Sequence, residues 1–266
     1  MRCMAAPQAS RPVVRSTSDR PRSRRVALAD DGGGPRGQGG QGGVASGHGL
    51  RQALLPLVAT LLVACAGAPP PPDWQLDAQG AIERAQEAYL RGDSAIEALE
   101  FARVREAIGR TGRADLLARA ELVRCATRVA SLVQEPCAGY AALAPDAAAP
   151  ERAYARYLAG EAVAADVALL PPQHRAAAQA GATGAAVAAI SDPLGRLVAA
   201  GVQLHRGQAD PLTIASAIDA ASAQGWRRPL LAWLGVQAYR AELAGDSQAL
   251  AQIRRRIALA GGDRVR

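Results

Sequence analysis

Residues 192–225 have the sequence DPLGRLVAAGVQLHRGQADPLTIASAIDAASAQG, in which the triplet Asp-Pro-Leu begins at Asp192 and again at Asp210. In both copies a glycine follows the proline by 14 residues, at Gly207 and at Gly225. Asp is a favourable N-cap, Pro suits the first helical position, and Gly suits the residue that ends a helix. The stretch therefore predicts two consecutive helices of similar length joined by a short loop.

The helical composition extends over residues 73–266, which are rich in the strong helix formers Ala, Leu and Arg. No period-2 run enriched in β-branched and aromatic residues, as strands would require, stands out in this part of the sequence. A segment of about 190 residues is long enough to bury a core. We therefore expect one all-α domain over 73–266.

Two similar turns indicate how the helices are connected. Leu90-Arg91-Gly92-Asp93-Ser94 is echoed by Leu243-Ala244-Gly245-Asp246-Ser247. The two helix starts lie 18 residues apart, so two such helices make a hairpin of about 36 residues, near the tetratricopeptide period of about 34. The chain resembles tetratricopeptide proteins in these helix–Gly-Asp–helix turns and in hairpin length, without the full Trp, Gly, Tyr, Ala and Phe pattern of that repeat. The resemblance implies an array of helical hairpins.

Apolar spacing predicts the first helix over about 77–91. Asp93 or Ser94 is expected to cap the second helix, and Ser94–Glu97 fits a capping box. The second helix is apolar on two sides, so we expect two neighbours to cover Phe101, Val104 and Ile108 on one side and Ile96 and Leu99 on the other. Glu97 and Glu100 are expected on a solvated face.

A third helix is expected after Thr111-Gly112, with Arg119, Arg124 and Arg128 mostly outward. Prolines divide residues 138–190, where we expect short helices. Two further helices are expected over about 226–244 and 246–259.

An apolar run precedes the helical domain, from Ala53 to Ala64, and is followed by Cys65 and by Pro69-Pro70-Pro71-Pro72. A membrane-spanning helix needs about 20 apolar residues, whereas this run has twelve with Pro56 inside it. A run of roughly 7–15 apolar residues is typical of the central part of a secretory signal.

Leu62-Val63-Ala64-Cys65 resembles the lipobox of bacterial lipoproteins. In those proteins the cysteine is acylated and the signal is cleaved before it. The resemblance implies a signal peptide over 44–64, a lipidated Cys65 as the first mature residue, and a Pro-rich linker over 65–72. Two or more acyl chains anchor a protein stably. Ala66, where an Asp would favour the inner membrane, implies the periplasmic face of the outer membrane.

Residues 1–43 are rich in Arg, Gly, Ser and Pro, and we expect them to be disordered. The chain has no Lys, no Asn and one Phe, as a GC-rich gene would give, and such genes often start at GTG. Since a signal normally lies at the N-terminus, we expect translation to start at Val44 and residues 1–43 to be a mis-assigned extension. A genuine basic leader is the alternative.

The formal net charge of +7 lies mostly outside the helical domain. Nine Arg and three Asp precede Ala66, whereas 22 Arg and 21 Asp and Glu follow from Ala66 onward, for a net +1. A nucleic-acid-binding domain carries concentrated positive charge. We therefore expect no nucleic-acid partner.

Cys125 and Cys137 are the cysteines of the helical domain, and an oxidising compartment favours their pairing. Bridged Cα atoms lie about 5.5 Å apart, whereas twelve residues of helix span about 18 Å. A disulfide therefore requires the helix of Cys125 to end before Pro136. Two buried free thiols are the alternative.

We assign no catalytic residue, metal ligand or cofactor from the sequence, because His174 and His205 stand alone and no nucleotide or nucleophile motif occurs. Candidate partner contacts are Trp226 and Trp233, seven residues apart on one helical stripe, and the basic run Arg254, Arg255 and Arg256. Core packing is the alternative for the tryptophans. A solvated helix end, or contact with anionic envelope lipid, is the alternative for the arginines.

The tether and the helical array together predict a non-enzymatic, outer-membrane-anchored lipoprotein. Its periplasmic domain would serve as an interaction or scaffold module for an unknown envelope protein or peptide. A periplasmic cell-wall-acting enzyme or enzyme accessory is one alternative, and a small-ligand carrier is another.

Overall fold

The computed structural model describes residues 70–262, which belong to one compact unit, and every regular element among them is helical. The expected all-α array is therefore confirmed. The expectations for residues 1–43, the signal peptide over 44–64 and Cys65 lie outside the described residues. The helices are α2 (Asp73–Arg91), α3 (Ser94–Gly109), α4 (Ala114–Ala130), α5 (Ala138–Ala141), η2 (Ala144–Asp146), α6 (Ala149–Leu158), η3 (Ala164–Leu169), α7 (Pro172–Ala178), α8 (Gly184–Ala188), α9 (Pro193–His205), α10 (Pro211–Gln224), α11 (Arg227–Leu243) and α12 (Ser247–Gly261).

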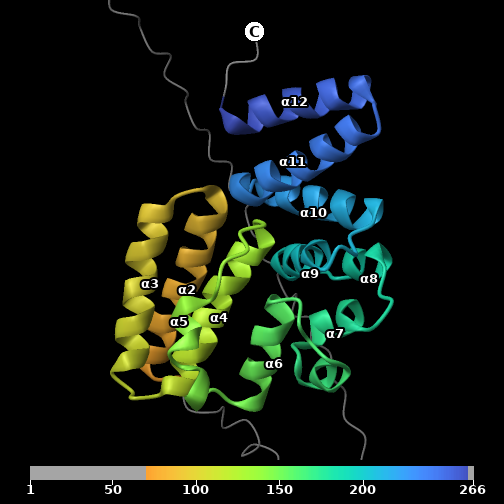
Figure 1. The fold of residues 1–266 in the computed structure, drawn as a ribbon. Coiled ribbons are helices and arrows are strands. Elements are labelled where there is room, and N and C mark those ends of the chain that lie inside the picture. Colours follow the sequence, from red (N-terminus) through yellow and green to blue (C-terminus); the bar gives the residue numbers. More distant parts are fainter. Residues whose placement is uncertain (1–69, 263–266) are drawn as a thin grey trace, which may run out of the picture. The chain divides into compact units, whose positions relative to one another are not determined.

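Consecutive long helices pack as hairpins, most extensively α2 with α3 and α11 with α12 (Figure 1). Helix α10 contacts α8, α9 and α11. Helix α4 is the central element, since it contacts α2 and α3 on one side and α5, α6 and α9 on others. Short helices and 3-10 turns occupy residues 138–190, as the prolines there predict.

The helix ends around residues 192–225 follow the sequence pattern. The carboxylate of Asp192 accepts from the backbone N–H of Gly195 at 2.6 Å, and Asp210 accepts from that of Thr213 at 2.7 Å. Gly225 ends α10 in the left-handed conformation at φ 66°. Asp210 also accepts from the N–H of Gly184 at 2.8 Å, so one carboxylate fixes the starts of both α8 and α10.

One predicted helix start and one predicted capping box differ from the structure. Helix α2 begins at Asp73 rather than near residue 77, because Pro72 is extended at the N-cap and Asp73 places a negative charge in the first turn. At the start of α3, Asp93 is the cap, which confirms one of the two predicted alternatives, and the capping box at Ser94 is absent. The side chain of Asp93 accepts a hydrogen bond from the backbone N–H of Ile96 at 3.0 Å. The carboxylate of Glu97 does not bond to the backbone at the start of α3, because it pairs with arginines of α4.

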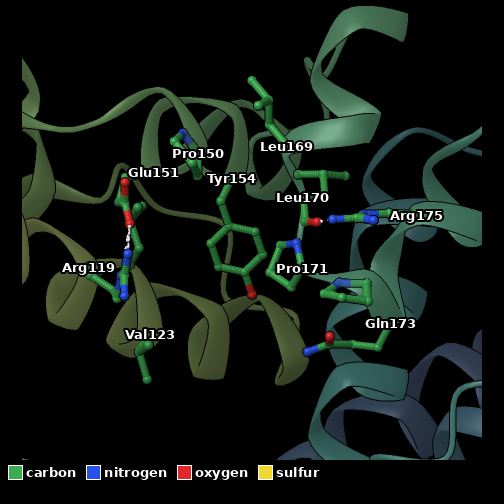
Figure 2. Close-up of a pocket in the computed structure, with 12 residues that line it drawn as sticks. Arg119, Val123, Pro150, Glu151, Tyr154, Leu169, Leu170, Pro171, Gln173 and Arg175 are labelled. Carbon is green, nitrogen blue, oxygen red and sulfur yellow. Dashed lines mark hydrogen bonds and ion pairs between the residues drawn. The ribbon is translucent and has the colours of Figure 1, made fainter.

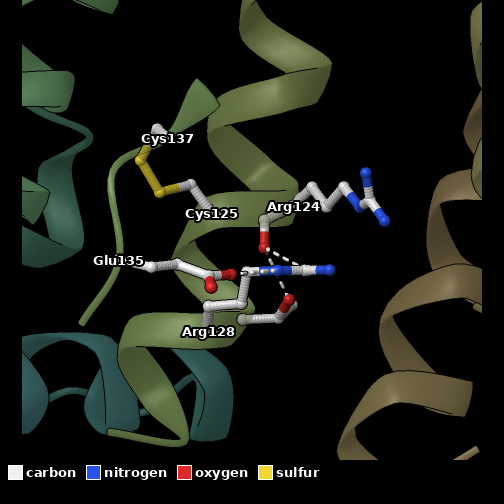
Figure 3. The surroundings of a disulfide bond; sticks show 6 residues. Arg124, Cys125, Arg128, Glu135 and Cys137 are labelled. Atoms are coloured by element: carbon white, nitrogen blue, oxygen red, sulfur yellow. Dashed lines mark hydrogen bonds and ion pairs between the residues drawn. A yellow bond between two sulfur atoms is a disulfide. The ribbon is translucent and has the colours of Figure 1, made fainter. Parts of the chain in front are cut away.

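The end of α4 meets the condition set by the two cysteines. The helix stops at Ala130, and Leu132 takes the left-handed conformation at φ 60°, so the chain turns back before Pro136. Cys125 and Cys137 then lie at disulfide distance, with 5.7 Å between Cα atoms, as predicted (Figure 3).

The core consists of two clusters of buried apolar side chains. A smaller cluster lies among α2, α3 and α4, around Phe101 and Val104. A larger one extends from α4 through α6 to the C-terminal helices. Helix α9 lies so close to the end of α4 that a Cβ at Gly201 would overlap the carbonyl oxygen of Val129.

The surface of α3 differs from the sequence prediction. Ile96 and Leu99 are 48% and 56% exposed, so no second neighbour from residues 70–262 covers that side of the helix. Glu97 and Glu100 are buried instead of solvated. The burial of the two glutamates has one cause, which is that α3 meets α2 and α4 partly through ion pairs.

The arginines of α4 are therefore not all outward. Arg124 donates to Glu97 at 2.6 Å, and Arg128 donates to the same carboxylate at 3.3 Å. Burial alone would raise the pKa of Glu97, but the hydrogen bonds and charges of the two guanidiniums outweigh it and the pKa is lowered. Arg128 also donates to the carbonyl oxygen of Arg124 at 3.2 Å, beside the disulfide (Figure 3).

Candidate functional site

The two tryptophans proposed as partner contacts lie in the core, which corrects that expectation. Trp233 is fully buried, and its indole N–H donates to the carbonyl oxygen of Ala130 at 3.1 Å. Trp226 is 9% exposed and donates to Glu87 at 2.8 Å. Their seven-residue spacing thus reflects a stripe facing the domain interior, the alternative interpretation of the same pattern.

Arg254, Arg255 and Arg256 are exposed on α12, and no carboxylate of the described residues forms an ion pair with them. No described helix is both long enough and apolar enough to span a membrane. No group of three or more His, Cys, Asp or Glu within 70–262 is arranged to hold a metal ion.

Two adjoining hollows follow α4 and form the candidate binding site. The first, which we name the α2–α4 groove, has a volume of about 670 Å³. The second, the α4–α6 pocket, lies between α4, α6, η3 and α7 and has a volume of about 510 Å³. Arg119 and Val123 of α4 line both hollows, so the two meet along one face of this helix.

The α2–α4 groove is mainly apolar with a polar rim. Its apolar lining comes from both helices and from the end of α3, and includes Trp74, Ile82, Ile108, Leu116 and Val123. Gln75, Gln79, Glu83 and Gln86 line it from α2. An apolar floor with polar edges is typical of surfaces that bind another chain.

The α4–α6 pocket joins a charged pair to an aromatic and proline-rich wall. The ring of Tyr154 lies between the Arg119–Glu151 pair and Pro171 (Figure 2). Leu169 and Leu170 contribute further apolar surface.

Glu151 is 6% exposed, yet only one of its carboxylate oxygens has a partner. Oε1 accepts a hydrogen bond from Nε of Arg119 at 2.8 Å and forms an ion pair with Nη2 of the same residue at 2.6 Å. Oε2 is buried with no hydrogen-bond partner among the described residues. Since buried polar atoms are nearly always paired, this oxygen is an exception among the buried polar atoms of the described residues.

His174 lies behind the pocket and does not line it. It is 2% exposed and packs against the rings of Tyr154 and Tyr157, with centroids 5.7 Å and 5.1 Å away. Burial lowers its pKa to about 4, although the charge of Asp192 acts in the opposite direction. The imidazole is therefore neutral near pH 7 and serves to support the aromatic wall.

Tyr154 keeps its proton over the whole physiological range. Burial, and then the charge of Asp192, raise the pKa of its phenol well above the ordinary value of 10. Its hydroxyl can therefore donate a hydrogen bond but cannot serve as a base near neutral pH.

The pocket residues were missed in the sequence because they carry no local pattern. Glu151 occupies the first turn of α6, where an acidic residue is ordinary because it complements the helix dipole. Only the prolines give a signal, since Pro150 is the second residue of α6 and Pro172 is the first residue of α7. They predict helix starts but not that the two starts converge.

No protein-family model, curated protein or solved structure matches this chain. Function is therefore argued from the lipobox and from the geometry of the two hollows.

Proposed function

We propose that this chain is an outer-membrane lipoprotein, anchored through Cys65, whose helical domain is a non-enzymatic module that binds a segment of another envelope protein or peptide. Leu62-Val63-Ala64-Cys65 supports the anchor. The prolines from 69 to 72 would separate the bilayer from α2.

The observation that carries the binding role is the pair of hollows meeting along α4. Helix α4 has 17 residues, so it is about 25 Å long. An extended chain rises about 3.3 Å per residue, so about eight residues of a partner would follow its length. Apolar side chains of that segment would fill the α2–α4 groove, and its backbone and polar groups would meet the rim. A concave surface of this kind fits the proposed likeness to tetratricopeptide arrays.

Lipidation is tested by intact mass. Expression in a bacterium with lipoprotein processing should give a mature protein that begins at Cys65 and carries acyl groups. The variant Cys65→Ser should lose both the acyl mass and membrane fractionation. A membrane-bound Cys65→Ser protein without acyl groups would contradict the proposed anchor.

Binding is tested by photo-crosslinking in cells. A photo-reactive residue at Gln79 or Glu83, which line the α2–α4 groove, should give one discrete adduct. The same residue at Arg103, on α3 and outside both hollows, is the control. The adduct should disappear when Ile82→Asp places a charge on the groove floor. Equal adducts from groove and control positions, or none from the groove, would refute the proposed site.

A further inference from the structure

Charge is unevenly distributed along the part of the chain that follows Cys65. Of its 22 Arg and 21 Asp and Glu, five Arg and one Asp lie in residues 247–266, which therefore carry a formal net charge of +4. The remaining 17 Arg and 20 Asp and Glu give residues 66–246 a net charge of −3. The near-neutral total thus combines an acidic body with a basic end, and α12 belongs to the basic end.

Helix α12 has three arginines in its middle and no acidic residue. Arg254, Arg255 and Arg256 are the eighth to tenth of its 15 residues. Its last turn, where cations complement the helix dipole, contains no basic residue, so the dipole does not explain this cluster. All three residues are exposed, and no carboxylate of the described residues forms an ion pair with them. An external anionic surface would supply the missing counter-charge.

An exposed leucine adjoins the arginines. Leu259 is 71% exposed and follows Arg255 by four residues and Arg256 by three, so these side chains are neighbours on the helix surface. Ile253, which is buried in the main core cluster, marks the inward face of α12. An apolar side chain flanked by cations is typical of helices that lie at a bilayer interface.

The outer face of α12 is available for such a contact. Helix α12 packs on α11 and is the last helix at its end of the array (Figure 1). The exposure of Arg254, Arg255, Arg256 and Leu259 shows that no residue within 70–262 covers this face.

We propose that the outer face of α12 docks on the anionic phospholipid head groups of the leaflet that holds the acyl chains of Cys65. The arginines would pair with lipid phosphates, which guanidinium groups bind well, and Leu259 would enter the interface between them. An anionic leaflet attracts the basic end and repels the acidic body, so the contact also orients the domain. The inference rests on the proposed anchor and adds which end of the domain faces the bilayer.

The anchor makes a weak electrostatic contact sufficient. Each arginine near an anionic leaflet strengthens the contact about fivefold, and three together about 100-fold. That would hold a free protein only weakly, but a tethered domain docks at a high effective concentration. The exposed leucine and the tether favour a bilayer over an acidic protein as the occupant of this face.

The two membrane contacts would be at separate ends of the domain. Helix α2 meets α11 through Tyr89 and Arg228, so the start of α2 at Asp73 is about 24 Å from that contact along the helix. The linker over 65–72 would span about 25 Å if it were extended as polyproline II. Docking of α12 would therefore lay the domain along the bilayer in place of leaving it upright on its linker.

The test is photo-crosslinking of the full, acylated chain in vesicles. One set contains phosphatidylethanolamine with phosphatidylglycerol, and the other contains phosphatidylcholine alone. A photo-reactive residue at position 259 should label lipid about tenfold more in the anionic vesicles. High salt should remove this difference because it screens the charges. The same residue at Leu99, which is 56% exposed on α3, is the control and should label lipid weakly in both sets.

Variants locate the contact. Replacing Arg254, Arg255 and Arg256 together with Gln should reduce the label from position 259 to the level of the Leu99 control. Replacing Arg110, Arg206 and Arg227 together with Gln makes the same change in net charge on exposed residues outside α12, and should retain the parent label. Thermal melts establish that each variant is folded. If the first triple variant is not, Arg255→Gln alone should weaken docking about fivefold.

Three results would overturn the inference. These are equal lipid label from positions 259 and 99, equal label in anionic and neutral vesicles, and equal effects of the two triple variants. An adduct between position 259 and a second protein, in place of lipid, would also overturn it and assign α12 to a protein contact.

The acyl mass on Cys65 is measured in the same samples, which separates this inference from the proposed anchor. An acylated, vesicle-bound chain without a lipid adduct at position 259 would refute the inference and leave the anchor standing. A lipid adduct from a chain that lacks acyl groups would support docking by α12 and refute the anchor alone.

Discussion

Arginine is the only strong cation in this chain, and it pairs with every buried carboxylate of the described residues. Several of these guanidiniums also lie over aromatic rings, with Arg124 4.6 Å from the centroid of Phe101 and Arg128 4.7 Å from that of Tyr89. A planar guanidinium can bind a carboxylate and stack on a ring, which lysine cannot do as well. The buried pairs are Glu97 with Arg124 and Arg128, Glu100 with Arg84 and Arg103, Glu121 with Arg105, Glu151 with Arg119, and Asp166 with Arg156.

His174 should make the domain sensitive to mild acid. Its pKa is about 4 in the folded state against an ordinary 6.5, so between these values the unfolded chain binds a proton that the folded chain does not. The free energy of unfolding should therefore fall as pH decreases from 6.5 to 4, by about 3 kcal/mol from this group. Denaturant titrations across that range measure it.

The variant His174→Phe, which keeps an aromatic ring against Tyr157, should flatten this part of the pH profile. His205 is exposed, so His205→Phe is the matched control and should retain the parent slope. If His174→Phe loses stability between pH 6.5 and 4 as steeply as the parent chain, His174 is not the sensor.

Gly201 is a position where a single added methyl group should destabilise the domain. Its Cβ would overlap the carbonyl oxygen of Val129, so Gly201→Ala must push α9 away from α4. We expect a loss of about 1–3 kcal/mol. Apart from the adjoining backbone of α11, no described atom lies within 4 Å of a Cβ at Gly235, so Gly235→Ala should instead stabilise by about 0.5–1 kcal/mol. Denaturation midpoints with the same sign for both variants would contradict this packing argument.

Individual helices were predictable where their signals are local. Asp192, Asp210 and Asp246 all accept from the N–H three residues on, as N-caps do. A cap and its partner lie within one turn, so sequence alone identifies them. Glu97 shows the opposite case, because its partner Arg124 is 27 residues away. Until α3 and α4 are packed together, nothing distinguishes this residue from a solvated glutamate.

The candidate site was less predictable than the helices for the same reason. Glu151 and Arg119 are 32 residues apart, and each fits an ordinary helical position on its own. The prolines of residues 138–190 indicated where short helices begin. They could not indicate that α6 and α7 would meet beside α4 and leave a pocket with one unpaired carboxylate oxygen.

The Cys125–Cys137 bridge should stabilise the turn after α4. In the chain-entropy model a loop of this size contributes about 3 kcal/mol. The variant Cys137→Ala, or the parent chain with a reductant, should therefore unfold at lower denaturant concentration. Adding reductant to Cys137→Ala is the control and should change nothing further. Identical midpoints for the oxidised and reduced parent would exclude a stabilising disulfide.

At the scale of the whole domain, the first and last parts of the described chain meet directly. Helix α2 contacts α11 although 139 residues separate Tyr89 from Arg228. Nε of Arg228 donates to the carbonyl oxygen of Tyr89 at 2.7 Å, and Nη2 donates to Ser94 at 2.8 Å. The same guanidinium lies 4.3 Å from the centroid of the Tyr89 ring. These contacts join the α2–α3 hairpin, which has its own apolar cluster, to the main core.

Arg228→Ala should therefore loosen one part of the domain and not the rest. Two hydrogen bonds and a cation–π contact are lost, which should lower the opening free energy of the α2–α3 hairpin by about 1–3 kcal/mol. Hydrogen exchange should become faster in Asp73–Arg91 and Ser94–Gly109, while α9 and α10 retain the parent rates, because parts of a domain with separate cores open separately. Arg227→Ala is the control, because it truncates the exposed neighbouring arginine. It should change the exchange rates neither of α2 and α3 nor of α9 and α10. If exchange in α9 and α10 accelerates as much as in α2 and α3, the domain opens as a single unit. The groove along α4, which needs α2 as one wall, would then persist in every state in which α9 and α10 remain folded.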